Sequence, residues 1–277
     1  VERGLYPGHR RELWQRFSGS SARCADAAPG YYSSVVALSE KIESLEDPST
    51  AVPNFTHMMK QIDKDTRRTF VGLRGVETYP FPRPELLQPV GQKLDDSAGS
   101  SSGDSGSVGS GNGDSDGGSS TAANAKGNFN AGTRGIVELR RLLSAFAVTN
   151  AKGNPEVGYC QGLNFVAAVF LLHMSEERAF YLLRAVVDVY MPEEYYTASM
   201  AGLLTDQEVF GHLLGETMPA LKAKLDSCAF PLSLCIDWFL CLFVTTLPLP
   251  VAMQVFDLFF LEGGVVLFQV ALCIFHV

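Results

Sequence analysis

Apolar residues recur at helical spacing over much of the chain. Between residues 133 and 148 they fall on one face of a helix, at Ile136, Leu139, Leu142, Leu143 and Phe146. The helix-breaking run NAKGNP at 150–155 is expected to end that helix. Residues 163–173 are apolar nearly all the way round, which is typical of a helix at the centre of a domain. The pattern therefore predicts two consecutive helices, the second buried on all sides.

Two further helices are indicated by the residues of their first turns. Ser175 is expected to cap one of them, followed by two glutamates that suit the positive end of a helix dipole. The run TDQE at 205–208 has the form of a capping box that opens a second helix, which Pro219 interrupts or ends. Its inward side chains are expected to be Val209, Phe210, Leu213 and Leu214. Because the sequence has neither period-two alternation nor a repeat of 20–50 residues, we expect an all-α fold.

Residues 238–256 carry no charge and are nearly long enough to cross a membrane. Pro248 and Pro250 interrupt this run, and Asp237 and Asp257 bracket it. Two prolines so close together break a helix. We therefore expect two buried helices joined by a proline turn, and no transmembrane segment.

A different composition occupies residues 93–128. Within 97–120, 10 of the 24 residues are Ser and 8 are Gly. Such a segment buries too little apolar surface to offset its ordering entropy, so it is expected to be a disordered, low-complexity loop insertion. We interpret residues 1–277 as a single multi-helix domain that carries this insertion. The chain ends inside an apolar helical pattern, so a truncated C-terminus is also expected.

Composition narrows the class of function. With 22 Lys and Arg against 30 Asp and Glu, the net charge of −8 argues against a nucleic-acid-binding protein. The six cysteines contain no C-x-x-C pair, which favours free thiols in a reducing, cytoplasmic compartment. No Gly-Lys dipeptide is present, which excludes a P-loop, and the isolated histidines lack the spacing of a zinc site, so no metal is expected. Cys160 could be a thiol nucleophile, although a packing role is favoured.

Two short motifs remain as candidate chemistry. Asn54 or Thr56 could cap a short helix that runs through Ile62, and Asp65 and Arg68 follow three residues apart, close enough to form an ion pair. An ordinary exposed ion pair would have the same spacing. In the second motif, Gln161 lies between two glycines at the start of the apolar helix, either as a helix-capping group or as an amide presented to a ligand.

Together these motifs resemble the TBC domain family of Rab GTPase-activating proteins. The family's Ile-x-x-Asp-x-x-Arg motif matches 62–68, and its Tyr-x-Gln motif matches 159–161, in the same order along the chain. The resemblance extends to further family landmarks at Gly4-Leu5, Arg10, Trp14, Ser18-Gly19, Trp238-Phe239, Asp257 and Glu262-Gly263. Two departures are Pro7, one place later than usual, and Phe256 in place of a tryptophan.

The resemblance implies a mechanism in which two side chains act in trans on GTP bound to a Rab. Arg68 would be an arginine finger at the phosphates and Gln161 a glutamine finger that orients the attacking water; Arg67 is the competitor for the first role. The supporting residues would be Ile62, Asp65, Tyr159, Gly162 and Asn164. The structural residues would be Trp238, Asp257 and the pair Arg10 and Trp14, which is expected to stack.

The same resemblance implies the remaining properties of the chain. It would need no cofactor of its own, because GTP and Mg²⁺ belong to the partner. It would be a monomeric cytoplasmic regulator of vesicle trafficking that binds GTP-loaded Rab, peripheral at most on trafficking membranes, and not a hydrolase by itself. The alternative is a non-catalytic Rab-binding or scaffold module of the same fold.

Overall fold

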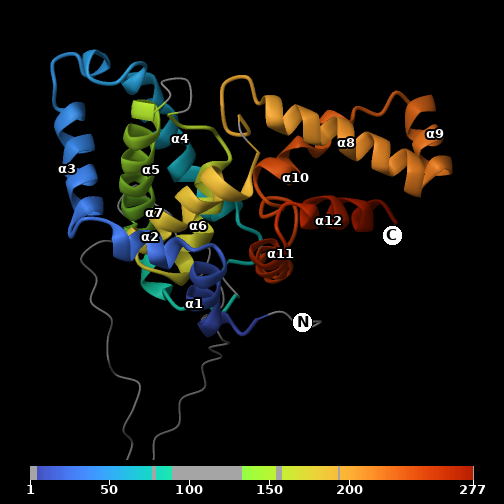
Figure 1. The fold of residues 1–277 in the computed structure, drawn as a ribbon, viewed down its shortest axis with the longest axis horizontal. Coiled ribbons are helices and arrows are strands. Elements are labelled where there is room, and N and C mark those ends of the chain that lie inside the picture. The colour runs from blue at the N-terminus through green and yellow to red at the C-terminus, as the bar shows by residue number, and fades with distance from the viewer. Residues whose placement is uncertain (1–4, 77–78, 89–132, 154–157, 193, 277) are drawn as a thin grey trace, which may run out of the picture.

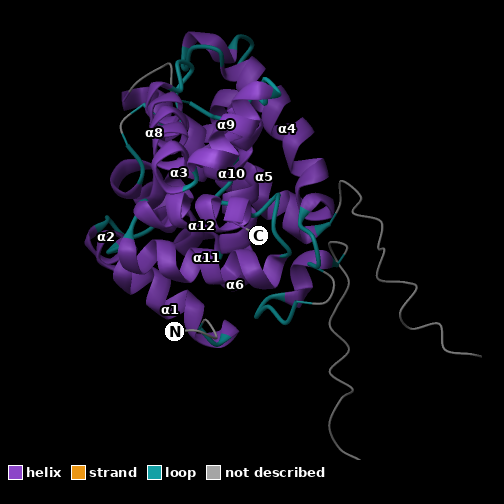
Figure 2. Ribbon diagram, turned by 90° about the vertical axis from the view of Figure 1, so that its right-hand side faces the viewer, coloured by secondary structure: helices purple, strands orange, loops and turns teal. Residues whose placement is uncertain are grey.

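Helices make up most of the part of the chain that the structure describes. The computed structural model describes residues 5–76, 79–88, 133–153, 158–192 and 194–276, and within them Figure 2 shows helices and loops but no strand. The predicted insertion at 93–128 lies outside the described residues. The α-helices are α1 (Pro7–Phe17), α2 (Ser20–Asp26), α3 (Tyr31–Glu43), α4 (Phe55–Gly72), α5 (Arg134–Gly153), α6 (Leu163–His173), α7 (Glu176–Ala185), α8 (Ala201–Thr217), α9 (Pro219–Ser227), α10 (Ile236–Leu240), α11 (Leu249–Glu262) and α12 (Val265–His276). Short helical turns are η1 (Pro48–Thr50), η2 (Pro84–Leu87), the π-helical η4 (Val186–Tyr190) and η5 (Leu232–Cys235).

The core is built around α6, as its all-round apolar composition predicts. Every residue of α6 except Phe165 is buried, and the helix contacts α1, α4, α5 and α7 (Figure 1). The apolar face predicted on the preceding helix is also confirmed, because all five of its residues are buried in α5. That helix runs on to Gly153, past the expected start of the break.

The uncharged run 238–256 forms two helices, as expected. It covers most of α10 and the first half of α11, and α11 begins directly after Pro248. Between them, residues 241–244 make a buried turn in which Leu242 and Phe243 have positive φ. In the part of the chain that the structure describes, no helix is long and apolar enough to cross a membrane.

The predicted capping box at 205–208 is wrong. Helix α8 begins one turn earlier, at Ala201, and the Thr205 hydroxyl donates to the Ala201 carbonyl from inside the helix. The polar groups at the helix start are the hydroxyl of Thr197, which accepts from the Met200 amide, and the hydroxyl of Ser199, which accepts from the Ala201 amide. Of the four expected inward positions, Phe210 and Leu214 are buried, whereas Val209 is 41 % exposed.

Ser175 and Asn54 lie at the helix starts predicted for them, but neither side chain caps its helix. Ser175 is the N-cap of α7, yet its side chain makes no capping hydrogen bond. Asn54 is the N-cap of α4 with a φ of 58°, again without a side-chain cap. Helix α4 has 18 residues instead of one short segment, so it carries Asp65 and Arg68 on a continuous helix. The break at Pro219 is confirmed, because it separates α8 from α9.

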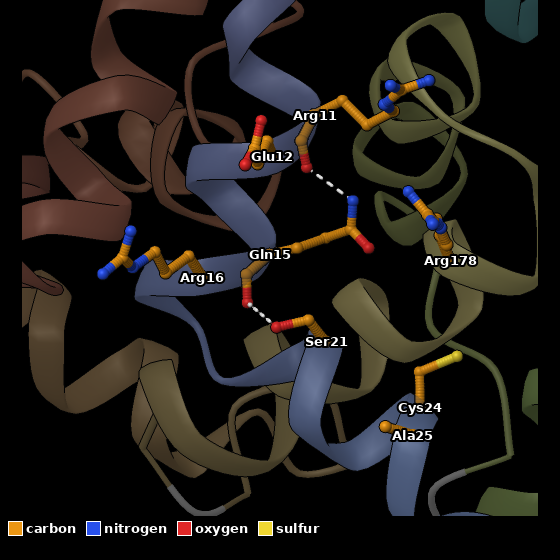
Figure 3. Close-up of a pocket in the computed structure, with 8 residues that line it drawn as sticks. All are labelled: Arg11, Glu12, Gln15, Arg16, Ser21, Cys24, Ala25 and Arg178. Atoms are coloured by element: carbon orange, nitrogen blue, oxygen red, sulfur yellow. Dashed lines mark hydrogen bonds between the residues drawn. The ribbon is translucent and has the colours of Figure 1, made fainter.

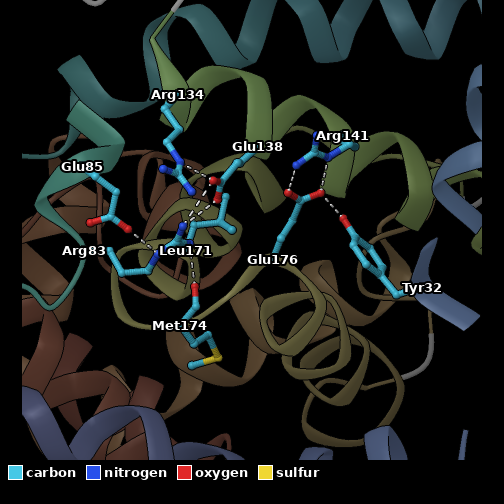
Figure 4. A network of polar contacts seen from close by, with 9 residues as sticks. All are labelled: Tyr32, Arg83, Glu85, Arg134, Glu138, Arg141, Leu171, Met174 and Glu176. Carbon is cyan, nitrogen blue, oxygen red and sulfur yellow. Dashed lines mark hydrogen bonds and ion pairs between the residues drawn. The ribbon is translucent and has the colours of Figure 1, made fainter. Parts of the chain in front are cut away.

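Two glutamates tie α5 to its neighbours (Figure 4). Glu138 accepts from Arg83, beside η2, at 3.0 Å and from Arg134 at 2.9 Å. On α7, Glu176 accepts from Nε of Arg141 at 2.6 Å. Both carboxylates are largely buried, where a paired charge is strongly favoured over an unpaired one. These contacts fix α5, and with it α4, which packs against α5.

A third carboxylate joins the N-terminal helix to α11. Asp257 accepts from Nε of Arg10 at 2.9 Å, from Nη2 of Arg10 at 2.8 Å and from the Trp14 indole at 2.9 Å. The expected stacking of Arg10 on Trp14 is corrected: the two side chains meet through Asp257, and the Arg10 guanidinium lies over the ring of Tyr79, 5.9 Å from its centroid. Arg10 and Trp14 lie one turn apart on α1 and both donate to the buried Asp257, which explains their spacing of four residues.

Candidate functional site

Asp65 is the centre of a polar cluster on one face of α4. Its side chain is fully buried, whereas that of Arg68, one turn later, is 45 % exposed. Arg68 Nη2 donates to Asp65 Oδ1 at 2.7 Å, and Gln61 Nε2, one turn earlier, lies 3.1 Å from both carboxylate oxygens. The pair is thus anchored on a buried carboxylate, unlike an exposed surface pair. The ion pair to Asp65 is made by Arg68, while the neighbouring Arg67 is exposed.

The loop 158–162 brings Gln161 to this face of α4. At Gly158 a Cβ atom would lie 2.0 Å from Met58 Sδ, so the loop packs directly on α4. At Gly162 the backbone φ is +110°, and a Cβ atom would lie 2.9 Å from Leu240 Cγ on α10. Only glycine accepts both that conformation and that contact without strain. The two glycines therefore let the loop run between α4 and α10 with Gln161 at its exposed point.

Tyr159 and Asn164 join the loop to the Asp65 cluster. The Tyr159 hydroxyl donates to Asp65 Oδ2 at 2.8 Å and lies 3.3 Å from Asn164 Oδ1. Asn164 Oδ1 accepts from the Gly162 amide at 3.0 Å, and its Nδ2 donates to the Thr69 hydroxyl at 2.9 Å. Helix α4 and the loop are thus fastened by contacts made from buried or half-buried side chains.

The side chain of Gln161 is linked to the same cluster. Gln61 Nε2 donates to Gln161 Oε1 at 3.1 Å. One amide group on α4 therefore contacts both Asp65 and Gln161. The two candidate fingers are therefore joined by a short chain of hydrogen bonds: Arg68 contacts Asp65, Asp65 contacts Gln61, and Gln61 contacts Gln161.

Burial controls the ionisation of the groups beside Asp65. It raises the pKa of Tyr159, and the Asp65 charge and the hydrogen bond to Asp65 raise it further. Burial, helped by the Asp65 charge, raises the pKa of Cys160 to about 11. Tyr159 therefore stays a hydroxyl donor at neutral pH, and Cys160 stays a thiol. A protonated, buried thiol is a poor nucleophile, which opposes the thiol-nucleophile alternative.

Two members of the cluster, Gln61 and Thr69, were not predicted. Both lie four residues from Asp65, so they share its helix face, and that spacing is the only signal the sequence offers for them. Ile62, the first residue of the motif, is fully buried in the core under α4. Trp238 is half-buried, with its ring centroid 5.7 Å from that of Phe275 on α12.

A hollow of about 600 Å³ lies elsewhere, between α1, α2 and α7 (Figure 3). Its lining includes Arg11, Gln15, Cys24 and Arg178. None of its lining comes from α4 or from the loop 158–162, so it is separate from the Asp65 cluster. Among the described residues, no group of three or more His, Cys, Asp or Glu side chains is arranged to hold a metal ion.

The Asp65 cluster presents one guanidinium and one primary amide on the same surface. A guanidinium is planar, permanently charged and suited to phosphate oxygens. A primary amide can donate and accept at once, as a group must to orient a water molecule against an anion. The buried side chains behind them supply rigidity instead of reactivity.

Comparison with known proteins identifies relatives of this chain. A family described as the Rab-GTPase-TBC domain matches residues 119–277, which include Gln161 but not Arg68. A protein of Emericella nidulans named for GTPase activation is 46 % identical over 144 residues, or 52 % of this chain and 12 % of its own length. Small G protein signaling modulator 3 of Homo sapiens is 38 % identical over 146 residues, 52 % of this chain and 19 % of that protein. The chain thus spans a small part of these relatives.

A solved structure extends the likeness to nearly the whole chain. The crystal structure of the Chlamydomonas flagellar RabGAP TBC domain superposes with a TM-score of 0.62 at 25 % sequence identity. It covers 97 % of this chain, and 66 % of that chain is matched. The likeness in fold therefore extends over the N-terminal part of the chain, which the family match leaves out.

Proposed function

Because the chain belongs to the Rab-GTPase-TBC domain family, we propose that it stimulates GTP hydrolysis by a Rab-family GTPase, with Arg68 and Gln161 supplied in trans. The observation that carries the proposal is the Asp65 cluster. It holds a half-exposed guanidinium through Asp65 and an exposed amide through Gln61, on one rigid surface. The non-catalytic module of the same fold would need no such pre-ordered pair.

The chemistry assigned to each side chain follows from phosphoryl transfer. Negative charge must be neutralised at the β- and γ-phosphate oxygens while a water molecule is held in line. Arg68 has five N–H donors and uses one on Asp65, so the others remain for phosphate oxygens. Gln161 takes the place of the GTPase's own glutamine: it accepts from the water and donates to an oxygen of the γ-phosphate. Asp65 and Tyr159 are positioning residues in this mechanism.

The nucleotide and its Mg²⁺ belong to the partner in this proposal. The partner is the GTP-bound form, because only that form offers a γ-phosphate, and the domain is no hydrolase without it. We further propose a monomeric domain in the cytoplasm that reaches trafficking membranes through the Rab. Its physiological effect would then be on vesicle trafficking.

The test is single-turnover GTP hydrolysis across a panel of purified, GTP-loaded Rab proteins. Wild type should accelerate at least one of them. Arg68→Ala should lower the stimulated rate by about 10³-fold, the lower end of the contribution of an arginine finger. Gln161→Ala should lower it by about 10²-fold, the cost of a misplaced reactant. Arg67→Ala, a neighbouring exposed arginine on the same helix, is the matched control and should change the rate little.

Other outcomes separate the alternatives. If a Rab binds but is not accelerated, the domain is a non-catalytic module. If Arg67→Ala abolishes stimulation and Arg68→Ala does not, Arg67 is the finger. A Rab whose own catalytic glutamine is replaced by leucine should still respond to wild type, since Gln161 supplies that function; loss of the response would refute the role of Gln161.

A further inference from the structure

Gln61 lies where helix α4 contacts the Gln161 side chain through polar atoms. It lies one helical turn before Asp65 and is half-buried. Its Nε2 atom is 3.1 Å from each Asp65 oxygen and 3.1 Å from Gln161 Oε1. A primary amide carries two N–H bonds, enough for one donation to the carboxylate and one to Gln161. We propose that Gln61 is a positioning residue that fixes the Gln161 side chain for GTP hydrolysis, an inference that rests on the proposed function.

The carboxylate decides which way both amides face. Asp65 pairs with the Arg68 guanidinium as a carboxylate, which can only accept, so Gln61 must turn its NH₂ group toward it. The same nitrogen contacts Gln161, which therefore has to present its oxygen to Gln61. It follows that the NH₂ group of Gln161 points away from Gln61. The orientation of the exposed amide is thus set from a buried charge two contacts away.

The Asp65 side chain is itself held in place by several contacts. It is fully buried and also accepts from Arg68 at 2.7 Å and from Tyr159 at 2.8 Å. Hydrogen bonds to a charged group are stronger than neutral ones. The hydrogen bond to Asp65 therefore fixes the Gln61 side chain, and the weaker, neutral hydrogen bond to Gln161 lets Gln61 restrain the Gln161 side chain.

Gln161 needs such a partner because its backbone alone does not order its side chain. The hydrogen bond between Asn164 and the Gly162 amide holds the loop, but the Gln161 side chain is exposed and has several rotatable bonds. Its Oε1 has two lone pairs, and Gln61 uses one. The second lone pair and the NH₂ group stay available, one for the attacking water and the other for a phosphate oxygen. Gln61 therefore orders Gln161 without blocking it.

The kinetic test uses Gln61→Met, which keeps the length of the side chain but removes both donors. We expect kcat for the responsive Rab to fall about tenfold, near the upper end of what one neutral hydrogen bond contributes, with KM within about twofold of wild type. Gln61→Asn keeps the amide but shortens its reach, and it should show the same loss. Gln254→Met, the same substitution at an exposed glutamine of α11, is the matched control and should change neither constant.

A double-mutant cycle decides whether the effect passes through Gln161. In a Gln161→Ala background, Gln61→Met should change kcat by less than about twofold, because the group it orders is gone. An undiminished tenfold loss in that background would overturn the inference and place the effect on Asp65 and Arg68. An unchanged kcat for Gln61→Met in the wild-type background would overturn it as well.

A second measurement needs no Rab and separates this inference from the proposed function. In the free domain, the NMR order parameter of the Gln161 side-chain amide, assigned by its loss in Gln161→Ala, should fall in Gln61→Met and stay constant in Gln254→Met. An order parameter that does not change in Gln61→Met refutes the positioning role, whatever the kinetics show. If wild type accelerates no Rab, the proposed function fails, and the order parameter alone decides the role of Gln61.

Discussion

His173 should make the stability of the domain depend on pH in a range where few other groups titrate. It is the last residue of α6 and only 1 % exposed. Its Nδ1 lies 2.9 Å from the Val169 carbonyl oxygen, and its Nε2 has no hydrogen-bond partner among the described residues. Burial lowers the pKa of His173 from 6.5 to about 4; the Arg10 charge adds to this, against the hydrogen bond to Val169 and the charge of Asp257.

The direction of the effect follows from proton binding in the two states. Between about pH 4 and 6.5 the unfolded chain protonates this histidine and the folded chain does not. The folded state is therefore fully favoured above pH 6.5 and loses stability as the pH falls. The two pKa values together correspond to about 3 kcal/mol at the acidic limit, of which about 2 kcal/mol should be lost between about pH 7.5 and 5. That is a large part of the stability of a typical domain.

The assay is urea denaturation at several pH values from about 7.5 to 5, for wild type and His173→Phe. The phenyl ring keeps the aromatic contact with Trp14, whose ring centroid is 4.9 Å away, but cannot be protonated. The drop in unfolding free energy between the two pH limits should be about 2 kcal/mol smaller in His173→Phe than in wild type. His212→Phe, at an exposed histidine of α8, should keep the wild-type drop. Equal drops in wild type and His173→Phe would refute the reasoning.

Three further changes test the site. Gly162→Ala should destabilise the domain by about 2 kcal/mol, because Gly162 has a positive φ and a Cβ atom there would contact Leu240. It should also lower stimulation of the Rab. Urea denaturation and single-turnover hydrolysis measure the two effects, and an unchanged stability would contradict the predicted backbone strain. Asp65→Asn should lower the unfolding free energy by about 1–3 kcal/mol, since an amide group then faces donors. It should also lower stimulation of the Rab, measured on folded protein; unchanged stimulation at matched folding would show that Asp65 positions nothing. Cys160→Ala should keep stimulation within about twofold, as burial keeps the thiol protonated. Loss of activity in a folded Cys160→Ala domain would restore the thiol-nucleophile alternative.

The sequence predicted the elements that local pattern controls. The bounds of α6 agree with the apolar run 163–173, and the proline break before α9 is where Pro219 places it. The start of α8 was wrong because the run TDQE satisfies the capping pattern while the helix already continues from Ala201. A capping box is a local signal, and here the hydroxyl caps of Thr197 and Ser199 begin the helix before it.

The candidate site was predictable only in part, and the reason is distance along the chain. Asp65 and Arg68 share a helix turn, so their pairing follows from spacing. The contact between Gln61 and Gln161 joins residues 100 positions apart, and no periodicity connects them. The role of Asp257 as a common acceptor was missed for the same reason, since it lies 247 positions from Arg10 and 243 from Trp14. Spacing predicts partners within a helix; partners between helices need the packing.

The Asp65 cluster holds its two exposed groups in different ways, and the difference suits their proposed tasks. Arg68 makes its contact with Asp65 through one nitrogen and is half exposed, so its guanidinium can turn toward an anion outside the domain. A buried carboxylate that loses its only cation is costly unless other donors remain. Here Asp65 does not depend on Arg68 alone, because Gln61 and Tyr159 donate to it as well. Because Arg68 spends only one of its donors on Asp65, it can reach phosphate oxygens with the others while Asp65, Gln61 and Gln161 keep their contacts.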